Sequence, residues 1–278
     1  MTLKSAHGAL TEDAYLATPN LQGVVSFIVD YVHEKHARTG VGGWLHLYTS
    51  YWYEGHNAAR SVRWREERRT AMIEATNADD EESFEKQADC VIRFLVRNWD
   101  PPKETWKKLF GYCRRFRSDQ TTLPTAKLFR HSVGRCKVIA LPFHENFILY
   151  DSRTAYALDQ LVNAHYMENR VDRSDHPLRV EQMEFPIPPN RSRSRRVTFV
   201  HGESPPFHGN LGRQGWLGWI FASYVSREIC RRLNANPATY GRPQHVWPGH
   251  EKEWYCYHLD MALWTLGGPA HEKICSSS

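Results

Sequence analysis

Apolar residues recur every three or four positions along most of the chain, a spacing that predicts amphipathic helices. The segments with this pattern are 21–39, 58–76, 83–99, 121–133, 215–234 and 251–268. Alternation of apolar and polar residues, which predicts strands, is confined to one short stretch at 196–200. The expected fold is therefore mainly α.

Two aspartates stand where a helix is expected to begin. Asp100 is followed by two prolines and an amphipathic run to residue 116, so we expect it to cap a helix. Asp151 follows four apolar or aromatic residues, after which the helical spacing continues to about Glu168. An aspartate accepts hydrogen bonds from first-turn amides, so helix capping is a sufficient role for Asp151 in the local sequence.

The chain contains no internal repeat and no clean linker, which favours one helical domain over residues 1–278. We divide it into an N-terminal helical part (1–80), a central helical region (81–168), an insertion (169–210) and C-terminal helices (211–278). The insertion is rich in proline and arginine and lacks apolar periodicity, so an irregular surface segment is expected there.

The 278 residues carry a formal net charge of +5, with arginine concentrated at 60–69, 113–117 and 191–196. Basic clusters beside aromatic residues suit a polyanion such as DNA. Acidic residues within 60–69 favour a solvated helix face there, whereas phosphate contact and a solvated loop both remain open for 191–196. The chain has no apolar run long enough to span a membrane and no apolar leader, so we expect a cytoplasmic protein without a membrane partner.

Cysteine and histidine positions do not suggest a cofactor. The six cysteines are scattered without a C-x-x-C pair, which is typical of reduced thiols. The fifteen histidines show no pattern that marks a zinc enzyme. We therefore expect neither a metal nor another cofactor, and a metal-dependent hydrolase is the least favoured class of function.

Three motifs deserve comparison with known families: "TAKLF" with Lys127, "ILYDSRTAYAL" with Asp151, and the C-terminal "HLDMALWTLGG". Together they resemble the helix-hairpin-helix DNA glycosylase superfamily, in particular its 8-oxoguanine glycosylase-like branch. In that family a lysine near the start of one helix is followed by an apolar stretch and by a catalytic aspartate that opens the next helix. The resemblance implies that 81–168 is the catalytic region, with Lys127 and Asp151 as its catalytic residues.

The implied reaction is excision of a modified base that has been flipped out of double-stranded DNA by a monomeric enzyme. A carboxylate at Asp151 would stabilise the oxocarbenium-like sugar, and the Lys127 amine offers attack at C1′ and a Schiff base instead. The substrate can be an oxidised purine, as in 8-oxoguanine repair. It can also be glucosylated hydroxymethylcytosine of phage DNA, in antiviral defence. We favour defence because "TTLPTA" stands where the family's hairpin carries glycines.

Aromatic and polar residues from two segments are candidates for the base pocket: Trp44, His46, Tyr51, Trp52, Glu54, His56, Arg213 and Trp216. Candidate contacts to DNA are the arginines Arg153, Arg191, Arg193, Arg195 and Arg196. A different class, a DNA-binding protein of the same fold without catalysis, remains open, because Asp151 would then be only a helix cap.

Overall fold

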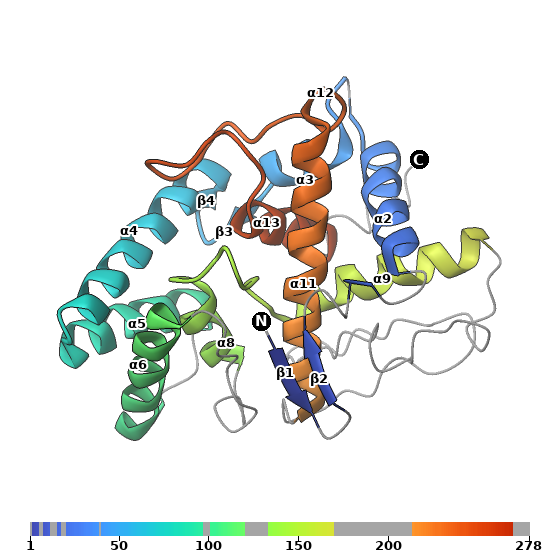
Figure 1. The fold of residues 1–278 in the computed structure, drawn as a ribbon. Helices are drawn as coiled ribbons and strands as arrows, with labels where there is room; N and C mark the ends of the chain where they lie inside the picture. Colours follow the sequence, from blue (N-terminus) through green and yellow to red (C-terminus); the bar gives the residue numbers. More distant parts are fainter. Residues whose placement is uncertain are drawn as a thin grey trace.

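A computed structural model of the chain describes residues 2–5, 8–11, 16–17, 21–38, 40–96, 101–119, 133–169 and 213–268. The mainly α fold that the periodicity predicts is confirmed (Figure 1). The described helices are α2 (Leu21–Lys35), α3 (Gly43–Thr49), α4 (Ala58–Asn77), α5 (Glu81–Leu95), α6 (Lys103–Ser118), α8 (Val133–Ala140), α9 (Ser152–Asn169), α11 (Arg213–Ala235), α12 (Pro237–Tyr240) and α13 (Cys256–Leu266).

Two short antiparallel hairpins accompany the described helices. Strand β1 (Thr2–Ser5) pairs with β2 (Gly8–Thr11), and β3 (Trp52–Tyr53) pairs with β4 (His56–Asn57). The β3–β4 turn contains Glu54 and Gly55 at positive φ, 49° and 78°, as a two-residue hairpin with a right-handed twist requires. This hairpin leads directly into α4, whose first turn Asn57 caps through Arg60 N at 2.9 Å.

Helices from both halves of the described chain share one hydrophobic core. Helix α11 crosses the middle of the molecule in Figure 1, and its fully buried Trp219 donates an indole hydrogen bond of 2.8 Å to Ile148 O. Helix α13 packs on α3, α9 and α11, and it is apolar on nearly every side, as expected for a helix surrounded by others. The end of α13 thereby comes to lie against the start of α9.

The contact between α13 and α9 depends on a glycine. A Cβ atom at Gly267, which follows α13, would lie 2.2 Å from Arg153 O in the first turn of α9. Only hydrogen fits at this position. The close approach fixes the beginning of α9, and with it Asp151, relative to α13.

Several predicted boundaries need correction. Helix α6 has Pro102 at its N-cap position, because prolines favour an extended conformation before the first turn, and Asp100 lies outside the described residues. Helix α5 ends at Leu95, and α13 begins at Cys256, where Tyr255 N donates a hydrogen bond of 3.1 Å to His258 Nδ1 in the first turn. Helices α3, α8 and α12 were not expected, whereas the predictions for 121–132, 169–210 and the strand at 196–200 lie outside the described residues, apart from Asn169 at the end of α9. Among the described helices, none has the length and apolar character that crossing a membrane requires.

Candidate functional site

A pocket of about 310 Å³, partly open to solvent, lies where α4, α8, α9 and α13 meet. Its wall combines aromatic and aliphatic side chains with two cations and two carboxylates. The lining residues are Tyr51, Tyr53, Arg65, Leu95, Lys137, Leu149, Asp151, Thr154, Asp260 and Trp264. Ligand sites in proteins commonly combine an apolar wall with a few convergent polar groups in this way.

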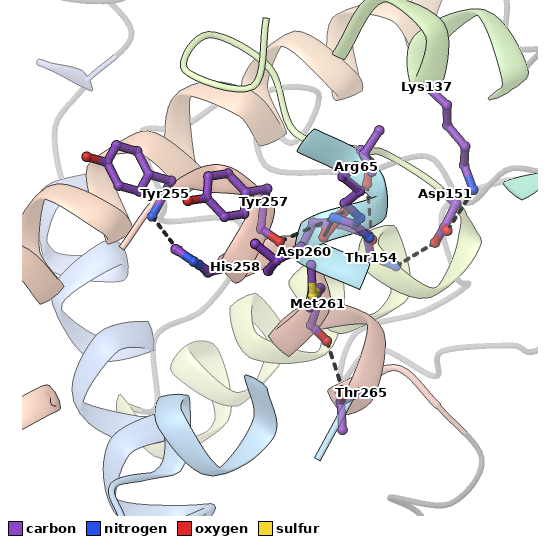
Figure 2. Close-up of polar contacts among 12 residues, drawn as sticks. Arg65, Lys137, Asp151, Thr154, Tyr255, Tyr257, His258, Asp260, Met261 and Thr265 are labelled. Atoms are coloured by element: carbon purple, nitrogen blue, oxygen red, sulfur yellow. Dashed lines mark hydrogen bonds and ion pairs between the residues drawn. The ribbon is translucent and has the colours of Figure 1, made fainter. Parts of the chain in front are cut away.

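Lys137 and Asp151 form an ion pair in this wall. Lys137 Nζ lies 3.2 Å from Asp151 Oδ2, and the two side chains are only 6% and 13% exposed. Figure 2 shows the Lys137 side chain extending from α8 toward Asp151 at the start of α9. Lys137 Nζ also donates to Leu95 O, 3.3 Å away, so that the ammonium group is held by two acceptors.

Asp151 is also the N-cap of α9. Its Oδ1 accepts hydrogen bonds from Arg153 N at 2.9 Å and Thr154 N at 3.1 Å, which satisfies two first-turn amides. The local sequence therefore predicted the capping role correctly. The other oxygen, Oδ2, faces Lys137 and the pocket, so capping occupies only half of the carboxylate.

A second ion pair lies deeper in the pocket (Figure 2). Arg65 Nη1 of α4 is 2.6 Å from Oδ1 and 2.9 Å from Oδ2 of Asp260 in α13, and it also donates to Tyr257 O at 3.2 Å. Burial raises the pKa of Asp260 to about 6, although Arg65 opposes the shift; the Asp151 carboxylate adds to it. The pocket thus contains two carboxylate–cation pairs, Lys137 with Asp151 and Arg65 with Asp260.

Aromatic rings form the remaining wall. Tyr53 and Trp264 meet edge to face at 5.2 Å between centroids, and Tyr53 is anchored by a hydrogen bond to Phe94 O at 2.9 Å. The Arg153 guanidinium lies 4.0 Å from the Trp264 ring centroid, a cation–π contact that fixes both side chains at the pocket. Flat, rigid walls of this kind suit a planar ligand.

Of the predicted pocket residues, Tyr51 is the one that lines the pocket within the described part of the chain. Trp44 belongs to the core, where its indole donates to Val29 O, because its position on α3 faces α2. His46 lies on α3 beside Ser50, and burial lowers its pKa. Neither side chain lines this pocket.

The other described candidates come from the β3–β4 hairpin, and they do not line the pocket either. Alternate strand residues point to opposite sides, so Tyr53 enters the pocket wall while Trp52 is 63% exposed. Glu54 occupies the exposed turn. His56 packs on Phe94 at 4.8 Å between ring centroids, and burial lowers its pKa.

Of the remaining predicted site residues, only Arg153 has a described side chain. Lys127, Arg191, Arg193, Arg195 and Arg196 lie outside the described residues. Arg213 and Trp216 belong to α11, but their side chains are not described. Arg153 is placed, and its contact with Trp264 sets its guanidinium beside the pocket.

The arginine cluster at 60–69 is partly structural. Arg65 is buried against Asp260, Arg68 donates to Gln87 at 2.7 Å, and Arg69 lies 5.1 Å from the Trp247 ring centroid. In the 113–117 cluster, Arg114 pairs with Asp79. The carboxylates of Asp260 and Asp79 offset the charges of Arg65 and Arg114, which reduces the positive charge that each cluster can offer to a polyanion.

Sequence reasoning missed most of the polar pocket. Lys137 lies in "GRCKVIAL", a segment interpreted as a loop, although its apolar residues after Gly134 were a signal for a short helix. Asp260 was detectable as the one acidic residue within the apolar "HLDMALWTLGG". No local signal distinguishes Arg65 from the neighbouring arginines of α4.

Comparison with known proteins found no family model, no curated protein and no solved structure that matches the chain.

Proposed function

We propose that the protein is a DNA glycosylase whose pocket receives a flipped modified base and whose Asp151 and Lys137 act on its glycosidic bond. The observation that carries the proposal is the buried pair of Lys137 Nζ and Asp151 Oδ2, 3.2 Å apart, in the wall of an aromatic pocket. The motif resemblance described a lysine on one helix, an apolar stretch and an aspartate opening the next helix. Lys137 on α8 and Asp151 before α9 fit that description, so Lys137 replaces Lys127 as the favoured amine.

The chemistry follows from the two charges. Departure of the base leaves positive charge on the sugar, and the Asp151 Oδ2 carboxylate oxygen is free of the helix cap to stabilise it or to orient a water molecule. Lys137 would attack C1′ only after losing a proton, and Asp151 Oδ2 is an acceptor within hydrogen-bond distance. Hydrolysis and Schiff-base formation thus use the same pair. In hydrolysis Lys137 remains a cation paired with Asp151, whereas in Schiff-base formation it is the nucleophile.

The pocket also bears on the substrate. The volume of about 310 Å³ includes open solvent, so the enclosed space is well below the range of about 300–1,000 Å³ for ligand sites. Tyr53 and Trp264 touch edge to face, so a nucleobase can enter only if the pocket wall opens. The pocket size therefore favours neither an oxidised base nor glucosylated hydroxymethylcytosine.

A non-catalytic DNA-binding role is the second candidate, and a specific observation favours it. Asp151 Oδ1 caps α9, Oδ2 pairs with Lys137, and Lys137 also holds Leu95 O. These contacts join α5, α8 and α9, and they account for the conformation of both side chains without any reaction.

The experiment incubates the protein with duplexes that carry unmodified bases, 8-oxoguanine or glucosylated hydroxymethylcytosine, and measures released bases by mass spectrometry. We expect wild type to release one modified base and Asp151→Asn to lose at least a hundredfold in rate. The matched control is Asp80→Asn, because Asp80 caps α5 through Ser83 N at 3.0 Å and does not line the pocket.

Borohydride reduction during the reaction distinguishes the two chemistries. A protein–DNA adduct that forms with wild type and Lys127→Met but not with Lys137→Met would identify Lys137 as the nucleophile. Base release without any adduct would indicate hydrolysis. If duplex DNA is bound but no base is released, the glycosylase proposal is refuted and the binding role is favoured.

A further inference from the structure

A second cluster of polar side chains lies apart from the pocket-lining residues. It joins His144 and Glu145, in the turn after α8, to His250 in the segment that precedes α13. His144 Nε2 is 3.9 Å and His250 Nε2 is 4.0 Å from Glu145 Oε1. One ligand atom from each of the three residues lies within 4.8 Å of the other two.

The His144 imidazole is buried without a partner. The residue is 3% exposed, and neither Nδ1 nor Nε2 has a hydrogen-bond partner in the structure. His250 Nδ1 is likewise buried and unpaired. A buried polar atom without a partner is costly, so such atoms usually mark the place of an ion or a water molecule.

Aromatic rings hold the two imidazoles in place. His144 lies 3.9 Å from the Trp247 ring centroid, and His250 lies 4.5 Å from that of Tyr255. These contacts restrict the rotation of both imidazoles.

We propose that His144, Glu145 and His250 bind a divalent transition-metal ion of the Zn²⁺ type. Imidazole nitrogens with a carboxylate oxygen are a donor set that suits Zn²⁺ better than Mg²⁺ or Ca²⁺. Zn²⁺ binds such donors at about 2.0–2.2 Å in a tetrahedron, which separates neighbouring donor atoms by about 3.4 Å. The two distances to Glu145 Oε1 need to close by roughly half an ångström, and the distance between the two histidine nitrogens, at most 4.8 Å, by up to about 1.4 Å.

Glu145 can close its own two distances, whereas the two imidazoles must approach each other by small side-chain rotations. The Glu145 side chain is 57% exposed, so it is free to move toward the two imidazoles and leaves the ion a path from solvent. Arg69 opposes the ion electrostatically, and the Glu145 carboxylate offsets this charge. The two Nδ1 atoms lack acceptors, so the affinity should be about 10–100-fold weaker than at a site whose histidines are hydrogen-bonded.

The position of the cluster gives the ion a structural role. The turn with His144 and Glu145 lies in the sequence between Lys137 and Asp151, and His250 precedes the helix with Asp260 and Trp264. A bound ion would therefore tie together two segments that both contribute residues to the pocket wall. Binding to the folded state alone raises stability by mass action.

The test uses the untagged full-length protein, freed of metal with EDTA and dialysed. Zn²⁺ is titrated in competition with a chromophoric zinc indicator, and the Tm is measured with and without Zn²⁺. We expect one equivalent bound per chain and a higher Tm, with binding weakened at least tenfold in His250→Gln and in Glu145→Gln. His245→Gln is the matched control, because its imidazole is exposed in the same segment.

Absence of stoichiometric binding, or equal binding by wild type and both variants, would overturn the proposal, and water would then occupy the cluster. Co²⁺ can replace Zn²⁺ as a spectroscopic probe. Thiolate charge-transfer bands in the Co²⁺ spectrum would also overturn the proposal, because cysteines would then be the ligands. The exposed position of Glu145 ensures that its variant folds. These readouts do not involve base excision, so the metal site and the glycosylase proposal succeed or fail separately.

Discussion

The Lys137–Asp151 pair can be tested by a double-mutant cycle that needs no substrate. The changes are Lys137→Met, Asp151→Asn and the two together. Methionine keeps most of the lysine's apolar stem, and asparagine keeps an oxygen that can cap α9, so the cycle isolates the charge interaction. Each single variant leaves one charge without its partner, whereas the double variant leaves none.

The expected magnitude follows from burial and distance. The two side chains are 6% and 13% exposed, and their charged atoms are 3.2 Å apart. Removing one partner of a buried pair typically costs about 3–5 kcal/mol, because the remaining charge is desolvated and uncompensated. Lys137 retains Leu95 O, so we expect the lower half of this range for Asp151→Asn. The double variant should be more stable than additivity predicts by at least about 1 kcal/mol.

The assay is urea unfolding at neutral pH followed by circular dichroism. The control cycle uses Arg93 and Asp89 on α5, whose side chains are 79% and 35% exposed and whose coupling should stay below about 1 kcal/mol. If the Lys137–Asp151 coupling is no larger than that of the control, the two groups are not a buried pair. The geometric basis of the proposed site would then be refuted.

Other predictions concern the close contact at Gly267, the pH dependence of stability and the exposed Trp52. Gly267→Ala should destabilise the fold by about 1–3 kcal/mol in urea, because its Cβ would meet Arg153 O at 2.2 Å. Gly23→Ala is the control: a Cβ atom at Gly23, on α2, would have no atom within 4 Å, so this change should leave the free energy of unfolding unchanged or increase it. Burial lowers the pKa of His258 to about 3, so between about pH 6.5 and 3 the unfolded chain binds a proton at this residue that the folded protein does not bind. The free energy of unfolding is therefore unaffected by this residue above about pH 6.5 and decreases as the pH falls toward 3. Between pH 7.5 and 5 the metal-free protein should lose about 2 kcal/mol through this residue, and a His258→Gln variant that shows the same pH dependence would contradict this assignment. Trp52→Ser should leave stability within about 0.5 kcal/mol, since the side chain is 63% exposed; unchanged affinity for single-stranded DNA would exclude a stacking role.

Asp151 illustrates what could be predicted from the sequence alone. The apolar run before it and the helical spacing after it predicted both the start of α9 and the capping role, which two backbone hydrogen bonds confirm. The same method placed the start of α6 too early, because the N-cap position is Pro102 and the helix begins at Lys103. It also missed α8, because its eight residues are too few to show a periodicity that stands out from a loop.

The sequence by itself determined the mainly α class, most of the long helices and the cap at Asp151. These features depend on contacts within about four residues, which the spacing of residue types records directly. Only the tertiary structure decided that Lys137 faces Asp151, that Arg65 of the charged helix is buried against Asp260, and that Trp44 belongs to the core. Side chains from distant segments meet according to how whole helices pack. The sequence alone therefore does not show which arginine or lysine of a charged helix is buried against a carboxylate.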